Sequence, residues 1–241
     1  MDLHDIRTKF CQLSGRYDLA TTGVEAFDTD NGADYYINAG MRFLDRRFFT
    51  HKSVGHIYEE IAADAFYVTF QNCISINEVW CTDDEDRWKL AKYSLKKIKE
   101  SYSTVRSDID TGAPLYYSPI NVRAVDGTDF ESLGEFLDYV KTDDDGTYSG
   151  IIIAPPADEA YNIEIIGRFY HTDLSNNTDE NFWTNRAPDT LVKAALYQLE
   201  VAYRNTEGAK DWLAAINLEG IDLEMNVVEQ DVQDSEVIEY E

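Results

Sequence analysis

Residues 34–47 have the sequence DYYINAGMRFLDRR, and this stretch decides the first part of the fold. Ile37, Met41 and Leu44 recur at steps of three and four residues, and Phe48 continues the spacing. Such spacing places apolar side chains along one face of an α-helix. The sequence therefore predicts an amphipathic helix that packs against other parts of the chain.

Two further helices are predicted on either side of this stretch. Near the N-terminus, Leu3, Ile6, Phe10 and Leu13 mark one buried stripe, and residues 28–32 (DTDNG) predict a turn into the helix at 34–47. Pro188 suits the first turn of the last long helix, where its missing N–H costs nothing. The buried side of that helix is predicted to carry Leu191, Ala195, Leu199 and Ala202, and its direction to continue toward Trp212 and Ile216.

A fourth helix is predicted over residues 82–102. Thr82 and Glu85 have the capping-box spacing that satisfies backbone donors at a helix start. An apolar stripe follows at Trp88, Ala91, Leu95, Ile98 and Tyr102. The lysines that fall off this stripe are interpreted as a solvated helix face rather than an anion site: Lys89, Lys92, Lys96, Lys97 and Lys99.

Alternation of apolar and polar residues predicts strands in two regions. Residues 66–70 and 74–76 alternate on either side of Gln71-Asn72, which predicts two strands and a tight turn, with a bulge near Asn77-Glu78. Residues 150–154 and 161–165 predict a second hairpin. The stretch 103–146 is expected to be irregular, with short strands.

Together these elements predict an α+β protein. We expect N-terminal and C-terminal helices to form a helical bundle, with a smaller antiparallel β-sheet inserted between them. A single domain is expected over residues 1–216, with its β-rich portion around 60–82 and 147–171. Residues 217–241 contain nine Asp or Glu and no Lys or Arg, which predicts an extended acidic C-terminal arm that orders only against a partner.

The composition restricts the function. The 241 residues carry a formal net charge of −25, which disfavours binding to DNA phosphates or to anionic lipid. No stretch approaches the length of a membrane span. Cys11, Cys73 and Cys81 have neither the number nor the spacing of a disulfide framework or zinc site, so reduced thiols are expected.

No catalytic or metal-binding motif emerges, and we expect no enzyme activity, no metal and no cofactor. The four histidines, His4, His51, His56 and His171, lack metal-ligand spacing, and no nucleophile elbow, P-loop or dinucleotide motif occurs. Residues 83–86 (DDED) suit a helix start better than a metal site. The acidic loops at 28–32 and 143–146 fail the EF-hand spacing.

Three regions resemble one known family. The first comprises residues 5–10 (DIRTKF), 13–19 (LSGRYDL) and 34–47; the second 151–161 (IIIAPPADEAY) and 163–170 (IEIIGRFY); the third 182–185 (FWTN), 187–196 (APDTLVKAAL), Leu199-Glu200 and 203–205 (YRN). In their order and spacing they resemble the head-to-tail adaptor proteins of tailed bacteriophages. The resemblance runs over most of residues 1–216.

The resemblance implies a structural protein of the virion. Such adaptors form a dodecameric ring beneath the portal protein, contact tail proteins and continue the channel through which DNA passes without specific binding. It implies assembly in the host cytoplasm and a place at the head–tail interface. On this interpretation the acidic arm docks onto the portal, and its apolar residues are the candidate anchors: Val227, Val228, Val232, Val237, Ile238 and Tyr240.

Two alternatives have different consequences. Another virion ring, such as a tail terminator or tail-tube protein, would have the same composition but different neighbours. A small hydrolase or a cation-dependent carbohydrate-binding module would need polar groups that converge in a pocket.

Overall fold

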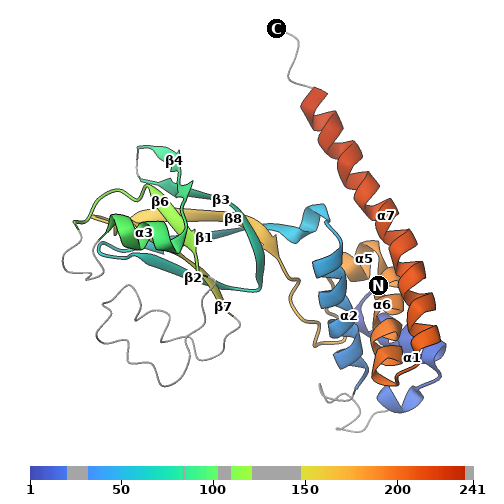
Figure 1. The fold of residues 1–241 in the computed structure, drawn as a ribbon. Coiled ribbons are helices and arrows are strands. Elements are labelled where there is room, and N and C mark those ends of the chain that lie inside the picture. Colours follow the sequence, from blue (N-terminus) through green and yellow to red (C-terminus); the bar gives the residue numbers. More distant parts are fainter. Residues whose placement is uncertain (21–31, 84, 103–109, 121–147, 237–241) are drawn as a thin grey trace. The chain divides into compact units, whose positions relative to one another are not determined.

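The computed structural model describes residues 1–20, 32–83, 85–102, 110–120 and 148–236, and it confirms the predicted α+β class. Residues 1–216 were expected to form one domain, but the chain divides into two compact units (Figure 1). The helical unit comprises Met1–Ser53 and Tyr170–Glu241, and the strand unit comprises Val54–Phe169.

The helical unit contains five α-helices and two short 3-10 turns within its described residues: α1 (Leu3–Ser14), η1 (Tyr17–Ala20), α2 (Ala33–Arg47), η2 (His51–Ser53), α5 (Phe182–Arg186), α6 (Pro188–Ala202) and α7 (Thr206–Glu236). The Asp2 side chain caps the start of α1 by accepting a hydrogen bond from the Asp5 N–H at 2.9 Å. Gly15, with φ +69°, ends this helix. The predicted turn at 28–32 lies largely outside the described residues.

The core of this unit confirms most of the predicted apolar stripes. Leu3, Ile6, Phe10, Ile37, Met41, Leu44, Phe48, Leu191, Ala195 and Leu199 are all buried in one cluster. Leu13 and Ala202, which were predicted on the same stripes, are exposed, because each lies at the C-terminal end of its helix. Gly40 lets α2 approach α6: a Cβ there would lie 2.7 Å from the backbone nitrogen of Ala195.

The last long helix is interrupted once. It begins at Pro188, as predicted, but it does not run on to Ile216. Arg204 adopts a left-handed conformation with φ +60°, which an α-helix does not tolerate, and the chain starts α7 at Thr206.

The acidic segment differs from the predicted extended arm, because residues 217–236 belong to α7. The first part of α7 is held by packing: Ile216 is fully buried, and Gly220 lies against the ring of Phe48. Once packed turns have supplied a helix nucleus, each added residue forms one more backbone hydrogen bond at small entropic cost. The predicted arm was considered without the packing of Ile216 and Gly220, so its helical start was missed.

The described residues of the strand unit form two four-stranded sheets, where one smaller sheet was expected. Sheet A has the order β1 (Val54–Ile61), β8 (Tyr161–Phe169), β3 (Cys73–Thr82), β4 (Arg87–Lys89), with every pair antiparallel. Sheet B has the order β2 (Tyr67–Gln71), β7 (Tyr148–Ala154), β6 (Tyr116–Pro119), β5 (Ala91–Lys92), and its β5–β6 pair is parallel. Both sheets contribute to one apolar cluster, which includes Val68, Ile151 and Ile153 from sheet B and Val79, Ile163 and Ile165 from sheet A.

The two predicted hairpins are wrong in their pairing, although their strands exist. β2 and β3 are joined at Asn72, with φ +62°, but β2 pairs with β7, whereas β3 pairs with β8 and β4. Likewise β7 and β8 lie in different sheets. Each connection carries the chain from one sheet to the other, because apolar residues on both sheets bury their surface against one another. The predicted bulge is confirmed by a register shift between Ile76 and Glu78.

The predicted helix over residues 82–102 is also wrong for most of its length. The segment forms β4, β5 and only then a short helix, α3 (Leu95–Ser101). The Asp83 carboxylate accepts hydrogen bonds from the N–H groups of Glu85 and Asp86, at 2.8 and 2.6 Å, so it forms a turn between β3 and β4. In a short acidic turn, as in a helix cap, a side-chain oxygen accepts hydrogen bonds from nearby backbone N–H groups. Pairing of β4 with β3 makes this segment a turn rather than a helix start.

Candidate interaction surfaces

The residues predicted as portal anchors divide into two groups. Val227, Val228 and Val232 lie within α7, whose backbone is described there, whereas Val237, Ile238 and Tyr240 lie outside the described residues. The structure therefore provides a helix, rather than an extended strand, to present the first three residues.

The described part of α7 has a packed side and an exposed side. Ile216 and Leu223 contact the core, and Glu219 receives a hydrogen bond from Thr190 at 2.7 Å and an ion pair from Lys193. Leu218 and Ile221 are 70% and 54% exposed, respectively. Burying two such aliphatic side chains on a partner would stabilise a complex by about 1.5–3 kcal/mol each if burial were complete. Leu218 and Ile221 lie within the predicted arm but were not among its predicted anchors.

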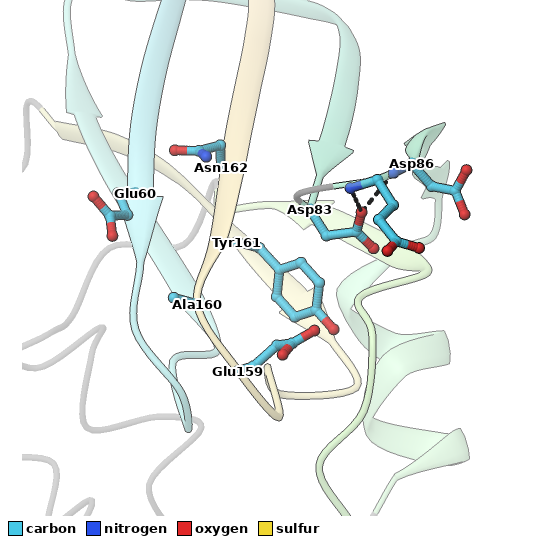
Figure 2. A pocket seen from close by; sticks show the side chains of 8 residues that line it. Glu60, Asp83, Asp86, Glu159, Ala160, Tyr161 and Asn162 are labelled. Atoms are coloured by element: carbon cyan, nitrogen blue, oxygen red, sulfur yellow. Dashed lines mark hydrogen bonds between the residues drawn. The ribbon is translucent and has the colours of Figure 1, made fainter.

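An acidic pocket opens at one end of sheet A in the strand unit (Figure 2). Its volume is about 500 Å³, and its lining includes the carboxylates of Glu60, Asp83, Glu85, Asp86 and Glu159, together with Ala160, Tyr161 and Asn162. None of the described residues in the lining is Lys or Arg. These residues come from β1, from the β3–β4 turn and from the start of β8, so no local sequence pattern predicts that they converge.

The surroundings of two pocket residues favour the ionised form of Asp83 and the neutral form of Tyr161. Hydrogen bonds from the backbone N–H groups of Asp86 and Glu85 lower the pKa of Asp83. Burial, together with the hydrogen bond that its hydroxyl donates to Asp158 at 2.7 Å, raises the pKa of Tyr161 well above its ordinary value. The five carboxylates in the lining attract positive charge to this pocket.

Glu164, on β8, is the shared partner of three side chains on the exposed face of sheet A. Its carboxylate accepts hydrogen bonds from His56 Nδ1 at 2.8 Å and from the Tyr58 hydroxyl at 2.9 Å, and it pairs with Arg87. The hydrogen bond from His56 lowers the pKa of Glu164, with further contributions from Tyr58 and Arg87 that outweigh the opposing effect of burial. The cluster joins β1, β8 and β4 across the sheet.

Trp80 lies beside this cluster on β3 and interacts with two cations. The Arg87 guanidinium lies 4.7 Å from its ring centroid and the Lys89 ammonium 5.8 Å. Its indole N–H donates to Glu78 at 3.0 Å, and Lys89 pairs with Glu78 at 2.5 Å. Tyr, Trp and Arg are the residue types that dominate protein interfaces, so this face has the composition of a docking surface.

The structure places the remaining candidate residues in structural roles. His171 bonds to the buried Asp45, His56 bonds to Glu164, and among the described residues no group of three or more His, Cys, Asp or Glu is arranged to hold a metal ion. The loop at 143–146 and most of that at 28–32 lie outside the described residues. Cys11 and Cys81 are buried free thiols, and Cys73 is half-buried. In the part of the chain that the structure describes, no helix has both the length and the apolarity to cross a bilayer.

Comparisons with known proteins add no relative. No protein-family model matches the chain, and a search of curated proteins finds no match.

Proposed function

We propose that this chain is a structural subunit of a tailed phage particle, which forms a ring that joins the portal of the head to the tail and continues the DNA channel. The observation that carries the proposal is the resemblance to head-to-tail adaptors. In the structure, segments of that resemblance that lie far apart in the sequence pack against one another in the helical unit.

Three contacts join these segments. Gly40, in residues 34–47, lies against Ala194 and Ala195, in residues 187–196. Arg7 forms a buried, two-pronged ion pair with Asp34, with Nε–Oδ1 at 2.5 Å and Nη2–Oδ2 at 2.6 Å. The Arg7–Asp34 ion pair is specific, because a buried charge that loses its partner is costly. These contacts support the interpretation that the matched residues specify one scaffold rather than a chance set of short similarities.

The third contact joins Asp45, at the end of the 34–47 segment, to Trp183, in residues 182–185. The indole N–H donates to the buried carboxylate at 2.7 Å. Both side chains are fully buried, so the bond fixes their relative position.

Helix α7 is the proposed portal-docking element. Its exposed Leu218 and Ile221 begin an apolar series that Met225, Val228 and Val232 continue in the sequence at steps of four, three and four residues. A helix with such a series can bind by placing apolar anchors in a groove of its partner. The acidic residues along α7 favour a groove with a basic rim.

The charge of the chain also suits this function. A formal net charge of −25 disfavours adhesion of DNA to the protein, which a channel for moving DNA requires. No individual carboxylate is assigned to the channel.

Crosslinking in assembled particles tests the proposal. We expect crosslinks from this chain to the portal protein and to a tail protein. Crosslinks to the tail tube alone would favour a tail terminator or tail-tube protein instead, and absence of the chain from particles would contradict any virion function.

Truncation after Leu223 tests the docking element separately. The remaining chain keeps Ile216, Gly220 and Leu223, which pack on the helical core, so we expect it to fold. We expect it to lose binding to the portal ring in co-sedimentation. Binding equal to that of the full chain would reject the assignment of α7, but it would leave the ring proposal in place.

A further inference from the structure

The two edges of sheet A carry opposite charges. β1, at one edge, contains Glu59 and Glu60 and no Lys or Arg, whereas β4, at the other edge, contains Arg87 and Lys89 and no carboxylate. All four of these charged side chains are exposed. The chain has a net charge of −25, yet the basic edge continues into a sequence without Asp or Glu up to Lys99.

The edge strand β1 lacks several of the usual protections against pairing. It is eight residues long and contains neither proline nor lysine, and among the described residues only β8 pairs with it. Proteins generally protect such an edge by shortening it, charging it or interrupting it, because its outer N–H and C=O groups otherwise attract another strand. The charges that β1 does carry, Glu59 and Glu60, repel a second acidic strand but suit a basic one, such as β4 of a partner.

We infer that copies of this chain continue sheet A from one subunit to the next, with β4 of one copy pairing beside β1 of the following copy. The inference rests on the proposed ring and specifies one contact within it. It commits to a second copy of this chain as the partner, because the chain itself supplies both complementary edges.

Strand direction is consistent with this contact. Sheet A has four strands, and each neighbouring pair is antiparallel, so β1 and β4 run in opposite directions. When a second copy extends the sheet in the same order, its β1 is antiparallel to the β4 that it meets. The contact uses two different edges, so it leaves one free edge at each end and extends until a ring closes.

The registers place Glu60, Arg87 and Lys89 on the same face, whereas Glu59 points to the other. One row across the sheet consists of Tyr58, Glu164, Trp80 and Lys89, and the next consists of Glu60, Asn162, Thr82 and Arg87. Tyr58 and Glu60 thus end the rows at the β1 edge, and Arg87 and Lys89 end them at the β4 edge. Directly opposed charges of opposite sign stabilise paired strands.

The acidic pocket gives Glu60 a reason to accept a cation from outside its own subunit. Four other carboxylates line the same pocket as Glu60, and none of the described lining residues is Lys or Arg, so a cation from outside the subunit is attracted there. Arg87 pairs with Glu164 in its own subunit, but a guanidinium has five N–H donors, which suffice for a second carboxylate.

Disulfide trapping with the full chain tests the contact. Four double variants combine Tyr58→Cys or Glu60→Cys with Arg87→Cys or Lys89→Cys, so that both residues on each edge are sampled. Within one subunit the two edges are separated by three strand spacings, roughly 14 Å, beyond the reach of a disulfide. The four single variants control for the native cysteines, and circular dichroism checks that each variant folds.

Each variant is oxidised alone and with the portal ring, and is then separated by non-reducing electrophoresis. We expect at least one double variant to give a ladder of dimers, trimers and higher oligomers, and the single variants to lack it. A product that stops at the dimer would overturn the inference, because a head-to-tail contact must extend.

The outcome also separates this inference from the proposed function. Loss of the ladder in all four double variants, in samples where light scattering shows rings on the portal, would overturn the sheet contact and leave the adaptor proposal standing. A chain that stays monomeric with the portal and gives no ladder would overturn both.

Discussion

Asp45 accepts two hydrogen bonds from His171, one from its backbone N–H at 2.9 Å and one from its ring Nδ1 at 2.8 Å. The Asp45 carboxylate is fully buried and also receives the indole N–H of Trp183. These donors offset the cost of removing a charge from water. The contact fixes the start of the second segment of the helical unit, at residues 170–173, to α2.

Asp45→Asn should destabilise the helical unit. The amide that replaces one carboxylate oxygen is a donor, so it faces a donor and leaves a buried polar group unsatisfied. We expect the free energy of unfolding to fall by about 3 kcal/mol. Urea denaturation followed by circular dichroism at the helix band measures it.

Asp173→Asn is the matched control. Asp173 pairs with Arg42 at 2.6 Å, but both side chains are about half exposed. Loss of such a surface pair should cost less than about 1 kcal/mol. Equal effects of the two substitutions would contradict the structural role of Asp45.

Gly40→Ala should also destabilise the helical unit, because the new Cβ would lie 2.7 Å from Ala195 N and 2.8 Å from the carbonyl carbon of Ala194. These are backbone atoms, so the helices must separate, at a cost of about 1–3 kcal/mol. Intrinsic helix propensity alone predicts the opposite sign, a gain of about 1 kcal/mol. Thermal unfolding decides between the two signs.

Gly208→Ala provides the comparison for Gly40. The atoms nearest to a Cβ at Gly208 are the ends of two flexible side chains, the exposed Asn205 and the half-buried Glu200, which can move. This substitution should leave the stability unchanged or raise it. A destabilised Gly208→Ala together with a stabilised Gly40→Ala would reverse the account of α2–α6 packing.

Glu164 should make the strand unit sensitive to acid. Because its interactions in the folded state lower its pKa, the stability that they contribute is present above the unfolded pKa of about 4.3 and is lost as the pH falls through the lower folded value. Glu164→Gln should therefore reduce the stability near neutral pH and flatten its decline in acid. Urea denaturation between about pH 7 and pH 3, followed by tryptophan fluorescence, measures both effects. An acid decline as steep as that of Glu59→Gln, an exposed glutamate on β1, would argue against the cluster.

The native thiols should react slowly. Burial raises the pKa of Cys73 to about 11 and that of Cys81 to about 12, and it raises the pKa of Cys11 as well. At pH 8 a thiol of pKa 11 is only about one-thousandth thiolate, the form that reacts. An aromatic disulfide reagent should label almost no thiol in the folded chain and all three in urea. Rapid labelling of a full equivalent before unfolding would contradict the burial of these side chains.

Local patterns predicted the helices whose apolar faces pack within one unit. α1, α2 and α6 have stripes such as Ile37, Met41 and Leu44, and these stripes were sufficient to place them. Residues 82–102 were wrongly predicted as one helix, because Trp88 and Leu95 fit a helical spacing. Pairing with β3 instead makes residues 87–89 a strand. The choice between strand and helix there depends on a partner that no local window contains.

Strand pairing and the candidate surfaces were beyond the reach of local patterns. β1 pairs with β8 and β2 with β7, across distances of about a hundred residues, whereas sequence proximity suggested hairpins. The acidic pocket joins Glu60, Asp83 and Glu159, and the Glu164 cluster joins His56 and Arg87.

The most direct measurement is the mass of the full chain in solution, by light scattering after size exclusion, with and without the portal ring. We expect a complex in which many copies of the chain join one portal ring. Images of that complex should show a second ring stacked on the portal. A chain that elutes as a free monomer at every ratio to the portal would contradict the claim that it joins head to tail.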